Sequence, residues 1–212
     1  HEIGSLEAIK CLIKDELFDY FAEVDNLIVT GSFLEPGFKF NDIDVVLVDN
    51  VKVDKNWEDY FQKKLGVKIH FTCLDRKSLR RGLQTDPLFQ MMMSRYIAKK
   101  REIFNVKTEF NYQLLDLHLL KSKILLDSFE NLTGKEKYDL TRNLLAIKLF
   151  LKKEKLTGNI LDKEIEKLFG KGMVAKLKEN MVKKSPFLRK FKQSYEQIFN
   201  EIMRGIKNGA KS

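Results

Sequence analysis

Two aspartates separated by one residue are the first candidates for chemistry in this chain. Asp42 and Asp44 flank Ile43 at the point where a loop enters the apolar run Val-Val-Leu-Val. In a strand, successive side chains alternate, so both carboxylates would project to one face and Ile43 to the other. The two carboxylates repel each other, and a divalent cation between them would remove that repulsion. Mg²⁺ (or Mn²⁺) binds one or two carboxylates together with waters and substrate phosphates, so the pair suits such a cation.

A Gly-Ser pair precedes the aspartates. Gly31 and Ser32 end the run Leu-Ile-Val-Thr, which predicts a short buried strand. Because Gly31 has no side chain, backbone N–H groups there could approach a phosphate closely, and the Ser32 hydroxyl adds a donor. A helical turn starting at Ser32 would present its positive end to an anion. Lys39 is the only basic residue between Ser32 and Asp42.

A third candidate is His70, which lies on the polar side of a run that alternates apolar with polar residues over positions 67–74. This alternation predicts a strand with one wet face. A neutral imidazole accepts a proton near pH 7 or ligates a metal. The alternative is that His70 is an ordinary, partly exposed strand residue. Asp75, just after the run, is a weaker candidate for an additional carboxylate.

The elements that would position these residues form a mixed α/β half. Apolar residues at spacings of three and four predict an amphipathic helix over 6–22, with Leu6, Ile9, Ile13, Leu17 and Phe21 as its stripe. Shorter patterns predict helices over 57–64 and over 79–101, the latter interrupted near Asp86-Pro87. Helices between apolar strands indicate a sheet layer covered by helices, hence an α+β fold.

From Tyr112 onward the sequence predicts only helices. Leu114, Leu117, Leu120, Ile124 and Leu125 predict the first, in which His118 is expected to be a partly buried residue rather than a ligand. Further helices are expected over 138–153, 162–169 and 173–181, and a last one that opens with Ser185 as N-cap and Pro186. The predicted organisation is therefore a mixed α/β domain over residues 1–106 and an all-helical domain over residues 107–212.

The charge of the chain is concentrated in its second half. Residues 1–106 contain 16 Lys and Arg against 17 Asp and Glu, whereas residues 107–212 contain 23 against 13. The densest basic patch consists of Lys183, Lys184, Arg189, Lys190 and Lys192. Such a half attracts polyanions, for example RNA, by its long-range field. The alternative is that these lysines are simply a solvated surface.

The order strand, Gly31-Ser32, gap, Asp42-Ile-Asp44 and strand resembles the nucleotidyltransferase superfamily typified by DNA polymerase beta and the minimal nucleotidyltransferases. The resemblance covers about residues 5–105. It implies that Gly31, Ser32 and Lys39 bind a nucleoside triphosphate and that Asp42 and Asp44 hold Mg²⁺ or Mn²⁺. It also implies attack by an acceptor hydroxyl on the α-phosphorus, with release of pyrophosphate.

The sequence departs from that family at the third strand, where the family commonly supplies a third carboxylate. Here the strand has His70 instead, which could replace the missing acid as the catalytic base. If nothing replaces it, transfer would be slow or absent. The alternative function is therefore a non-catalytic nucleotide- or nucleic-acid-binding module of the same fold, similar to antitoxins. A third hypothesis is a helical interaction protein in which the Asp-Ile-Asp is incidental.

Composition excludes several classes of protein. With 43% hydrophobic and 33% charged residues, the chain is neither disordered nor collagen-like. No uncharged apolar run approaches the ~20 residues that cross a bilayer, so no membrane association is expected. Two cysteines, Cys11 and Cys73, make neither a disulfide framework nor a metal cluster, which favours a cytoplasmic location.

Overall fold

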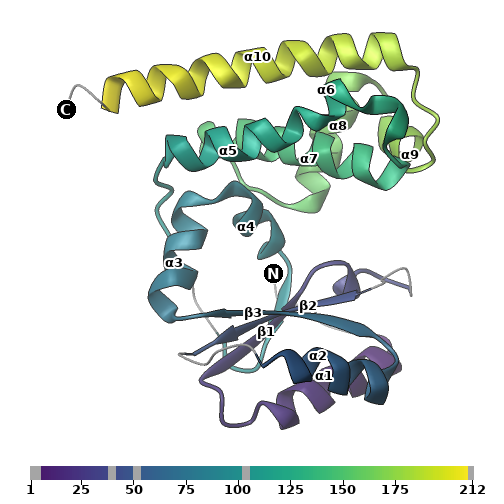
Figure 1. Cartoon of the computed structure of the whole chain (residues 1–212), viewed down its shortest axis with the longest axis vertical. Helices are drawn as coiled ribbons and strands as arrows, with labels where there is room; N and C mark the ends of the chain where they lie inside the picture. The colour runs from purple at the N-terminus through teal and green to yellow at the C-terminus, as the bar shows by residue number, and fades with distance from the viewer. Residues whose placement is uncertain (1–5, 38–41, 50–53, 102–105, 210–212) are drawn as a thin grey trace. The chain divides into compact units, whose positions relative to one another are not determined.

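The computed structural model describes residues 6–37, 42–49, 54–101 and 106–209 (Figure 1). The chain divides into two compact units. The first unit comprises His1–Leu83 and Met92–Lys107, and the second comprises Gln84–Met91 and Thr108–Ser212. The chain therefore enters the second unit briefly before it completes the first. The architecture is mixed α+β, as the sequence predicts, with a sheet in the first unit and helices in the second.

The sheet of the first unit has the strand order β3-β2-β1-β4. Its strands are β1 (Asn26–Thr30), β2 (Asp42–Val48), β3 (Lys68–Leu74) and β4 (Tyr96–Ala98). β1 pairs antiparallel with both β2 and β4, whereas β2 and β3 are parallel. A parallel pair needs a crossover connection, and α2 (Lys55–Leu65) supplies it.

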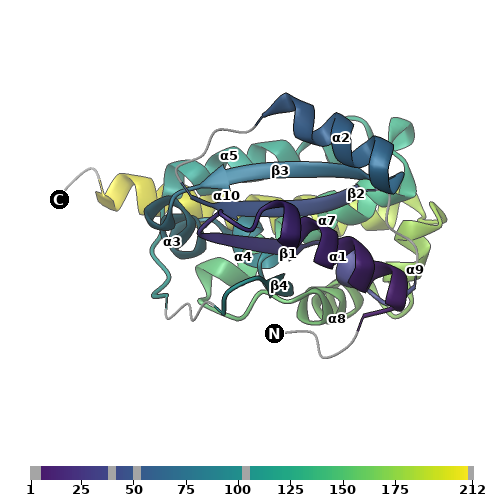
Figure 2. The ribbon, with the colours of Figure 1, turned by 90° about the horizontal axis from the view of Figure 1, so that it is seen from below.

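The helices α1 (Ala8–Tyr20) and α2 cover one face of this sheet (Figures 1 and 2). Alternate residues of β1, β2 and β3 point into the core between helices and sheet, for example Val29, Val45 and Ile69, which are almost fully buried. An aromatic cluster closes the space between helices and sheet. Its rings belong to Phe21, Trp57, Phe61 and Phe71. The expected stripe of α1 is confirmed at Ile13, Leu17 and Phe21, but Ile9 is 48% exposed.

The helix predicted over 79–101 is wrong beyond residue 92. The structure has α3 (Arg76–Thr85), α4 (Pro87–Met92) and then the strand β4. Asp86 ends the first helix and accepts hydrogen bonds from the N–H groups of Leu88 and Phe89, while Pro87 occupies the first position of α4. The next residues pair with β1, so a long-range contact overrides their local helical pattern.

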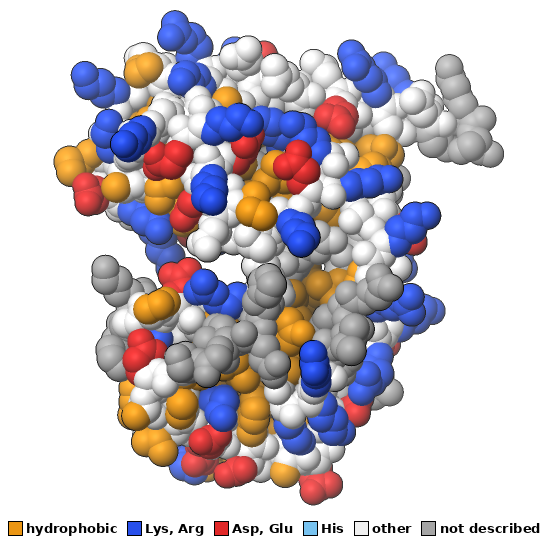
Figure 3. Space-filling model, turned by 180° about the vertical axis from the view of Figure 1, so that it is seen from behind, with side chains coloured by type: hydrophobic (Ala, Val, Ile, Leu, Met, Phe, Trp, Pro, Cys, Tyr) orange, Lys and Arg blue, Asp and Glu red, His pale blue; other side chains and the backbone are white. Residues whose placement is uncertain are grey.

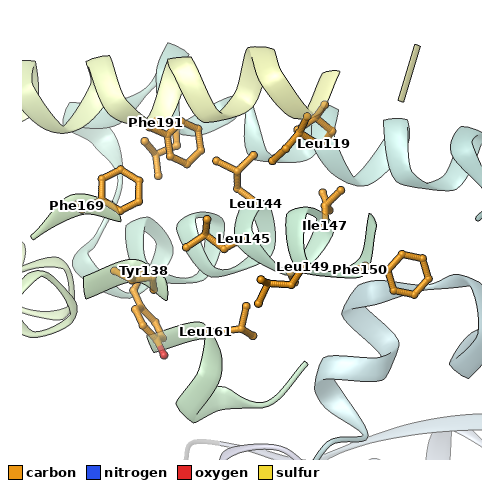
Figure 4. Close-up of a cluster of buried hydrophobic side chains, with 14 of the residues drawn as sticks. Leu119, Tyr138, Leu144, Leu145, Ile147, Leu149, Phe150, Leu161, Phe169 and Phe191 are labelled. Carbon is orange, nitrogen blue, oxygen red and sulfur yellow. The ribbon is translucent and has the colours of Figure 1, made fainter. Parts of the chain in front are cut away.

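The second unit is built from helices packed around α7 (Gly134–Leu151). Its other helices are most of α4, then α5 (Tyr112–Ser122), α6 (Ile124–Asp127), α8 (Gly158–Phe169), α9 (Met173–Lys178) and α10 (Lys184–Gly209). Leucine and phenylalanine side chains from α5, α7, α8 and α10 meet in one core, shown in Figure 4. α10 begins one residue before the expected N-cap Ser185, and Pro186 lies in the first turn, where its missing N–H costs nothing.

The expected apolar stripe of α5 is not its buried face. Leu117 is 50% exposed and Leu120 is 59% exposed, whereas Leu115, His118 and Leu119 are buried. Leucines lie on nearly every side of this helix, so periodicity alone could not select the face. Within the described residues, no helix has the length and apolar character to cross a membrane.

Candidate functional site

Asp42 and Asp44 lie on the same face of the sheet. Both are half-buried residues of β2, and the Ile43 between them is completely buried on the opposite face. This face is the one that α1 and α2 leave uncovered, because the residues that pack against those helices have the opposite parity. The expected alternation of side chains at the Asp-Ile-Asp is therefore confirmed.

Gly31 brings the backbone into contact with one of these carboxylates. Thr30 is paired with Asp44 across β1 and β2, so the residue after Thr30 turns next to the Asp44 side chain. A Cβ atom at position 31 would lie 2.4 Å from Asp44 Oδ2, and Gly31 has a φ of 82°. Only glycine fits both this close approach and this backbone conformation without strain. The bend and the carboxylate thus form one local structure.

Ser32 begins a short turn, η1 (Ser32–Leu34), and is exposed. The hydrogen bonds of the turn itself are donated by the N–H groups of Leu34 and Glu35. With three residues the turn is too short to have the macrodipole of a helix, so any phosphate contact there depends on the local N–H groups and the Ser32 hydroxyl. The expected positive helix end is therefore reduced to a single turn.

The segment after this turn is fixed by α1. The ammonium of Lys10 is completely buried, donates to the carbonyl oxygen of Glu35 at 2.5 Å and pairs with Glu7 at 3.1 Å. Glu7 Oε1 accepts from the N–H of Gly37 at 2.6 Å. This hydrogen bond, helped by Lys10, lowers the pKa of Glu7 below its ordinary value. Both contacts anchor the chain that leads from Ser32 toward Asp42.

His70 lies beside both aspartates. It is the register partner of Asp44 across the parallel strands, and its Nε2 lies 3.4 Å from Asp42 Oδ2. The side chains of His70 and Asp42 are 42% and 38% exposed. The imidazole is thus accessible to solvent and to a ligand, and it lies within reach of the carboxylate pair.

The register also places in the site two residues that the sequence patterns do not single out. Tyr96, Thr30, Asp44 and His70 are paired in succession across β4, β1, β2 and β3. Residues directly opposite one another share a face, so these four form a polar row across the sheet. The Thr30 hydroxyl lies 2.5 Å and 3.0 Å from the carbonyl oxygens of Met92 and Arg95, which holds the entry to β4 against β1. Tyr96 could be found only by recognising β4.

Two other residues do not join the site. Asp75 lies beyond the far end of β3, where its Oδ1 accepts from the N–H of Ser78 at 2.5 Å. That hydrogen bond lowers the pKa of Asp75, as expected for a helix-capping carboxylate. Arg76 pairs with Asp25 at 2.8 Å near the start of β1. Lys39 lies outside the described residues.

The donor set at this face fits a hard divalent cation. Among the described residues there is no group of three or more His, Cys, Asp or Glu side chains placed to hold a metal. A pair of half-exposed carboxylates beside a glycine bend instead suits a cation that completes its coordination with water and phosphate oxygens, as Mg²⁺ does. Asp42 and Asp44 are the residues that would hold it.

Comparison of the chain with protein-family models, with curated proteins and with solved structures finds no match.

Proposed function

We propose that the protein is a metal-dependent nucleotidyltransferase, which moves a nucleoside monophosphate from a nucleoside triphosphate to an acceptor hydroxyl. The observation that carries this proposal is the contact between the Gly31 bend and the Asp44 carboxylate, with Asp42 on the same face. A polyphosphate held at the bend would lie directly beside the acids that bind its cation.

The residues of the site fall into groups with different tasks in this reaction. Asp42 and Asp44 would hold Mg²⁺, which when bound would neutralise the phosphate charge that develops in the transition state. The backbone at Gly31 and the Ser32 hydroxyl bind and orient the phosphates, and Lys39 is assigned to the same task. Lys10 and Glu7 hold the segment after the turn in place.

The proton of the acceptor hydroxyl requires a base, and His70 is assigned this role. The acceptor oxygen forms a bond to the α-phosphorus while the bond to the leaving pyrophosphate breaks, and His70 takes the hydroxyl proton. Asp42 Oδ2, 3.4 Å from Nε2, orients the imidazole. The acceptor is a hydroxyl on an RNA end, a protein side chain or a small molecule, bound by the basic helical unit.

A second function is favoured by one observation, the histidine at the position where a carboxylate would be expected in the resembling family. A site with only two acids could bind a nucleoside triphosphate without turnover, as a binding module of antitoxin type. The two functions share the same contacts with the cation and the phosphates. They differ in whether pyrophosphate is released.

The test measures pyrophosphate release with each of the four nucleoside triphosphates, Mg²⁺ and a pool of acceptor RNA. We expect Asp44→Asn to reduce the rate at least about 100-fold, or roughly 3 kcal/mol of transition-state stabilisation. Asp59→Asn is the matched control, because Asp59 is an exposed aspartate of α2, which covers the other face of the sheet.

Calorimetric titration of a triphosphate in the presence of Mg²⁺ distinguishes the alternatives. Binding without pyrophosphate release would favour the non-catalytic module. Neither binding nor release, with Asp44→Asn indistinguishable from the unmodified protein, would leave only the helical interaction protein.

A further inference from the structure

The described residues include two buried lysines, and they differ in their surroundings. Lys10 in the first unit has a carboxylate partner, Glu7, at 3.1 Å. Lys137 on α7 in the second unit is 4% exposed. A buried ammonium is costly unless an opposite charge and hydrogen bonds compensate for its lost hydration. The partners of Lys137 therefore show whether its charge is compensated.

The contacts of Lys137 are neutral. Its Nζ donates to Asn180 Oδ1 at 2.7 Å and lies 4.0 Å from the centroid of the Phe129 ring. Within the described part of the chain, no carboxylate oxygen lies within 4.0 Å of this ammonium. The amide and the ring compensate for part of the burial, but neither carries a charge. The carboxylate of Glu130 acts on this ammonium through space, since Lys137 contributes to the lowered pKa of Glu130.

Three exposed lysines belong to the segment that follows and includes the end of α9, which packs on the start of α7. The start of α7 packs on the end of α9, since a Cβ at Gly134 would lie 2.4 Å from the carbonyl oxygen of Lys178. The Lys178 ammonium lies 4.4 Å from the ring centroid of Tyr138, next to Lys137 in sequence. Lys183 and Lys184 follow Asn180 closely and are exposed. We call Lys137, Lys178, Lys183 and Lys184 the lysine corner.

The acids near the lysine corner already have partners. Glu130 pairs with Lys184 at 2.8 Å, and this contact lowers the pKa of Glu130 below its ordinary value. Glu136 accepts from the N–H of Thr133 at 2.7 Å as part of the capping box of α7. The charge of Lys137 also contributes to the lowered pKa of Glu130, whereas Lys178 and Lys183 take part in neither of these contacts.

We propose that the lysine corner binds the phosphate backbone of a nucleic-acid strand. The cations belong to α7, α9 and the start of α10, so they are spread over more surface than one phosphate covers, as contact with successive phosphates requires. Figure 3 shows Lys and Arg side chains, in blue, on the face of the helical unit that it presents. The inference deepens the acceptor part of the proposed function by naming the surface, but binding at the corner needs neither triphosphate nor metal.

The experiment is fluorescence anisotropy with a labelled 20-nucleotide single-stranded RNA, measured between about 50 and 300 mM salt without triphosphate or Mg²⁺. We expect Lys183→Gln combined with Lys184→Gln to weaken binding. Each lost phosphate contact should reduce the salt slope by about 0.7 and the affinity about fivefold at 0.1 M salt. Lys137→Met keeps the apolar stem, removes the charge, and should weaken binding in the same direction.

The matched control is Lys152→Gln combined with Lys155→Gln, which removes the same charge from exposed lysines near the opposite end of α7. If both double variants lost the same amount of RNA affinity, the proposal would be overturned, because binding would then depend on the overall positive charge and not on the lysine corner. Absence of RNA binding, or binding only to vesicles of anionic phospholipid, would also overturn the proposal. Because Lys183 and Lys184 are exposed, the double variant remains informative even if Lys137→Met unfolds, which thermal unfolding would show.

Discussion

Gly31 is the residue of the candidate site at which a substitution by alanine, which adds one methyl group, is expected to disturb the structure most. Its φ of 82° is unfavourable for residues with a side chain, and a Cβ there would meet Asp44 Oδ2. Gly37 provides a comparison, because it also has a positive φ, of 83°, but a Cβ added to it would meet nothing within 4 Å. The two glycines separate backbone strain from contact with the carboxylate.

We predict that Gly37→Ala lowers the free energy of unfolding by about 1–2 kcal/mol through its positive φ, and that Gly31→Ala lowers it by more, because a φ of 82° with a ψ of −161° is a conformation open almost only to glycine. Only Gly31→Ala should also weaken binding of triphosphate and Mg²⁺, because it displaces the Asp44 carboxylate. Urea unfolding and calorimetric titration of both variants are the measurements. Equal triphosphate affinities would show that the contact at Gly31 has no part in binding.

At the scale of elements, α1 is tied to the loop that follows the Gly-Ser bend. The buried ammonium of Lys10 donates to the carbonyl oxygen of Glu35, and Glu7 accepts from the N–H of Gly37. The sequence alone does not predict this anchoring, because position 10 lies between two expected core positions and is typical of a solvated lysine. The helix therefore has a task beyond covering the sheet.

Lys10→Met should lower the free energy of unfolding by about 2 kcal/mol, since it removes the hydrogen bond that a charged, buried donor makes to the Glu35 carbonyl oxygen. Glu7→Gln, which keeps an acceptor for Gly37, should cost less. Urea unfolding followed by circular dichroism measures both. If Lys10→Met proved the milder variant, the contact between Lys10 and Glu35 would not stabilise the loop.

The sequence predicts elements well where one pattern dominates and poorly where two compete. Strands β1, β2 and β3 are predictable because each is a compact β-branched or alternating run. β4 is not, since a three-residue strand has too few residues to show a period and becomes visible only through its pairing with β1. That Asp42 and Asp44 lie on the same face of the sheet can be predicted from the alternation of side chains along a strand. The neighbours Thr30 and Tyr96 require the register of the whole sheet.

On the scale of the whole molecule, Asp86 links an inserted segment to the helical unit. Its Oδ1 accepts from the N–H groups of Leu88 and Phe89 and lies 3.1 Å from His118 Nε2. Burial raises the pKa of Asp86, but His118 and these N–H groups outweigh burial and hold the pKa below its ordinary value of 3.8. As expected from the sequence, His118 is a buried structural residue.

A lowered pKa in the folded state means that the ionised Asp86 stabilises the fold. This contribution should be fully present above pH 3.8 and should be lost as the pH falls through the lower folded-state value. Asp86→Asn keeps a helix-capping oxygen but removes the charge, so it should flatten the acid dependence of the free energy of unfolding. Urea unfolding at several pH values between about 2 and 6 tests this, and an unchanged acid dependence would contradict it.

The alternation of the chain between its two units has a consequence for dissecting the protein. Gln84–Met91 belongs to the second unit, yet β4, which completes the sheet, comes after it. A gene fragment that stops before this insertion would encode a sheet without its fourth strand and without Tyr96. A fragment that stops after β4 would carry eight residues whose packing partners had been deleted. No single stop codon yields an intact half, so the units are best studied by replacing residues within the full-length polypeptide.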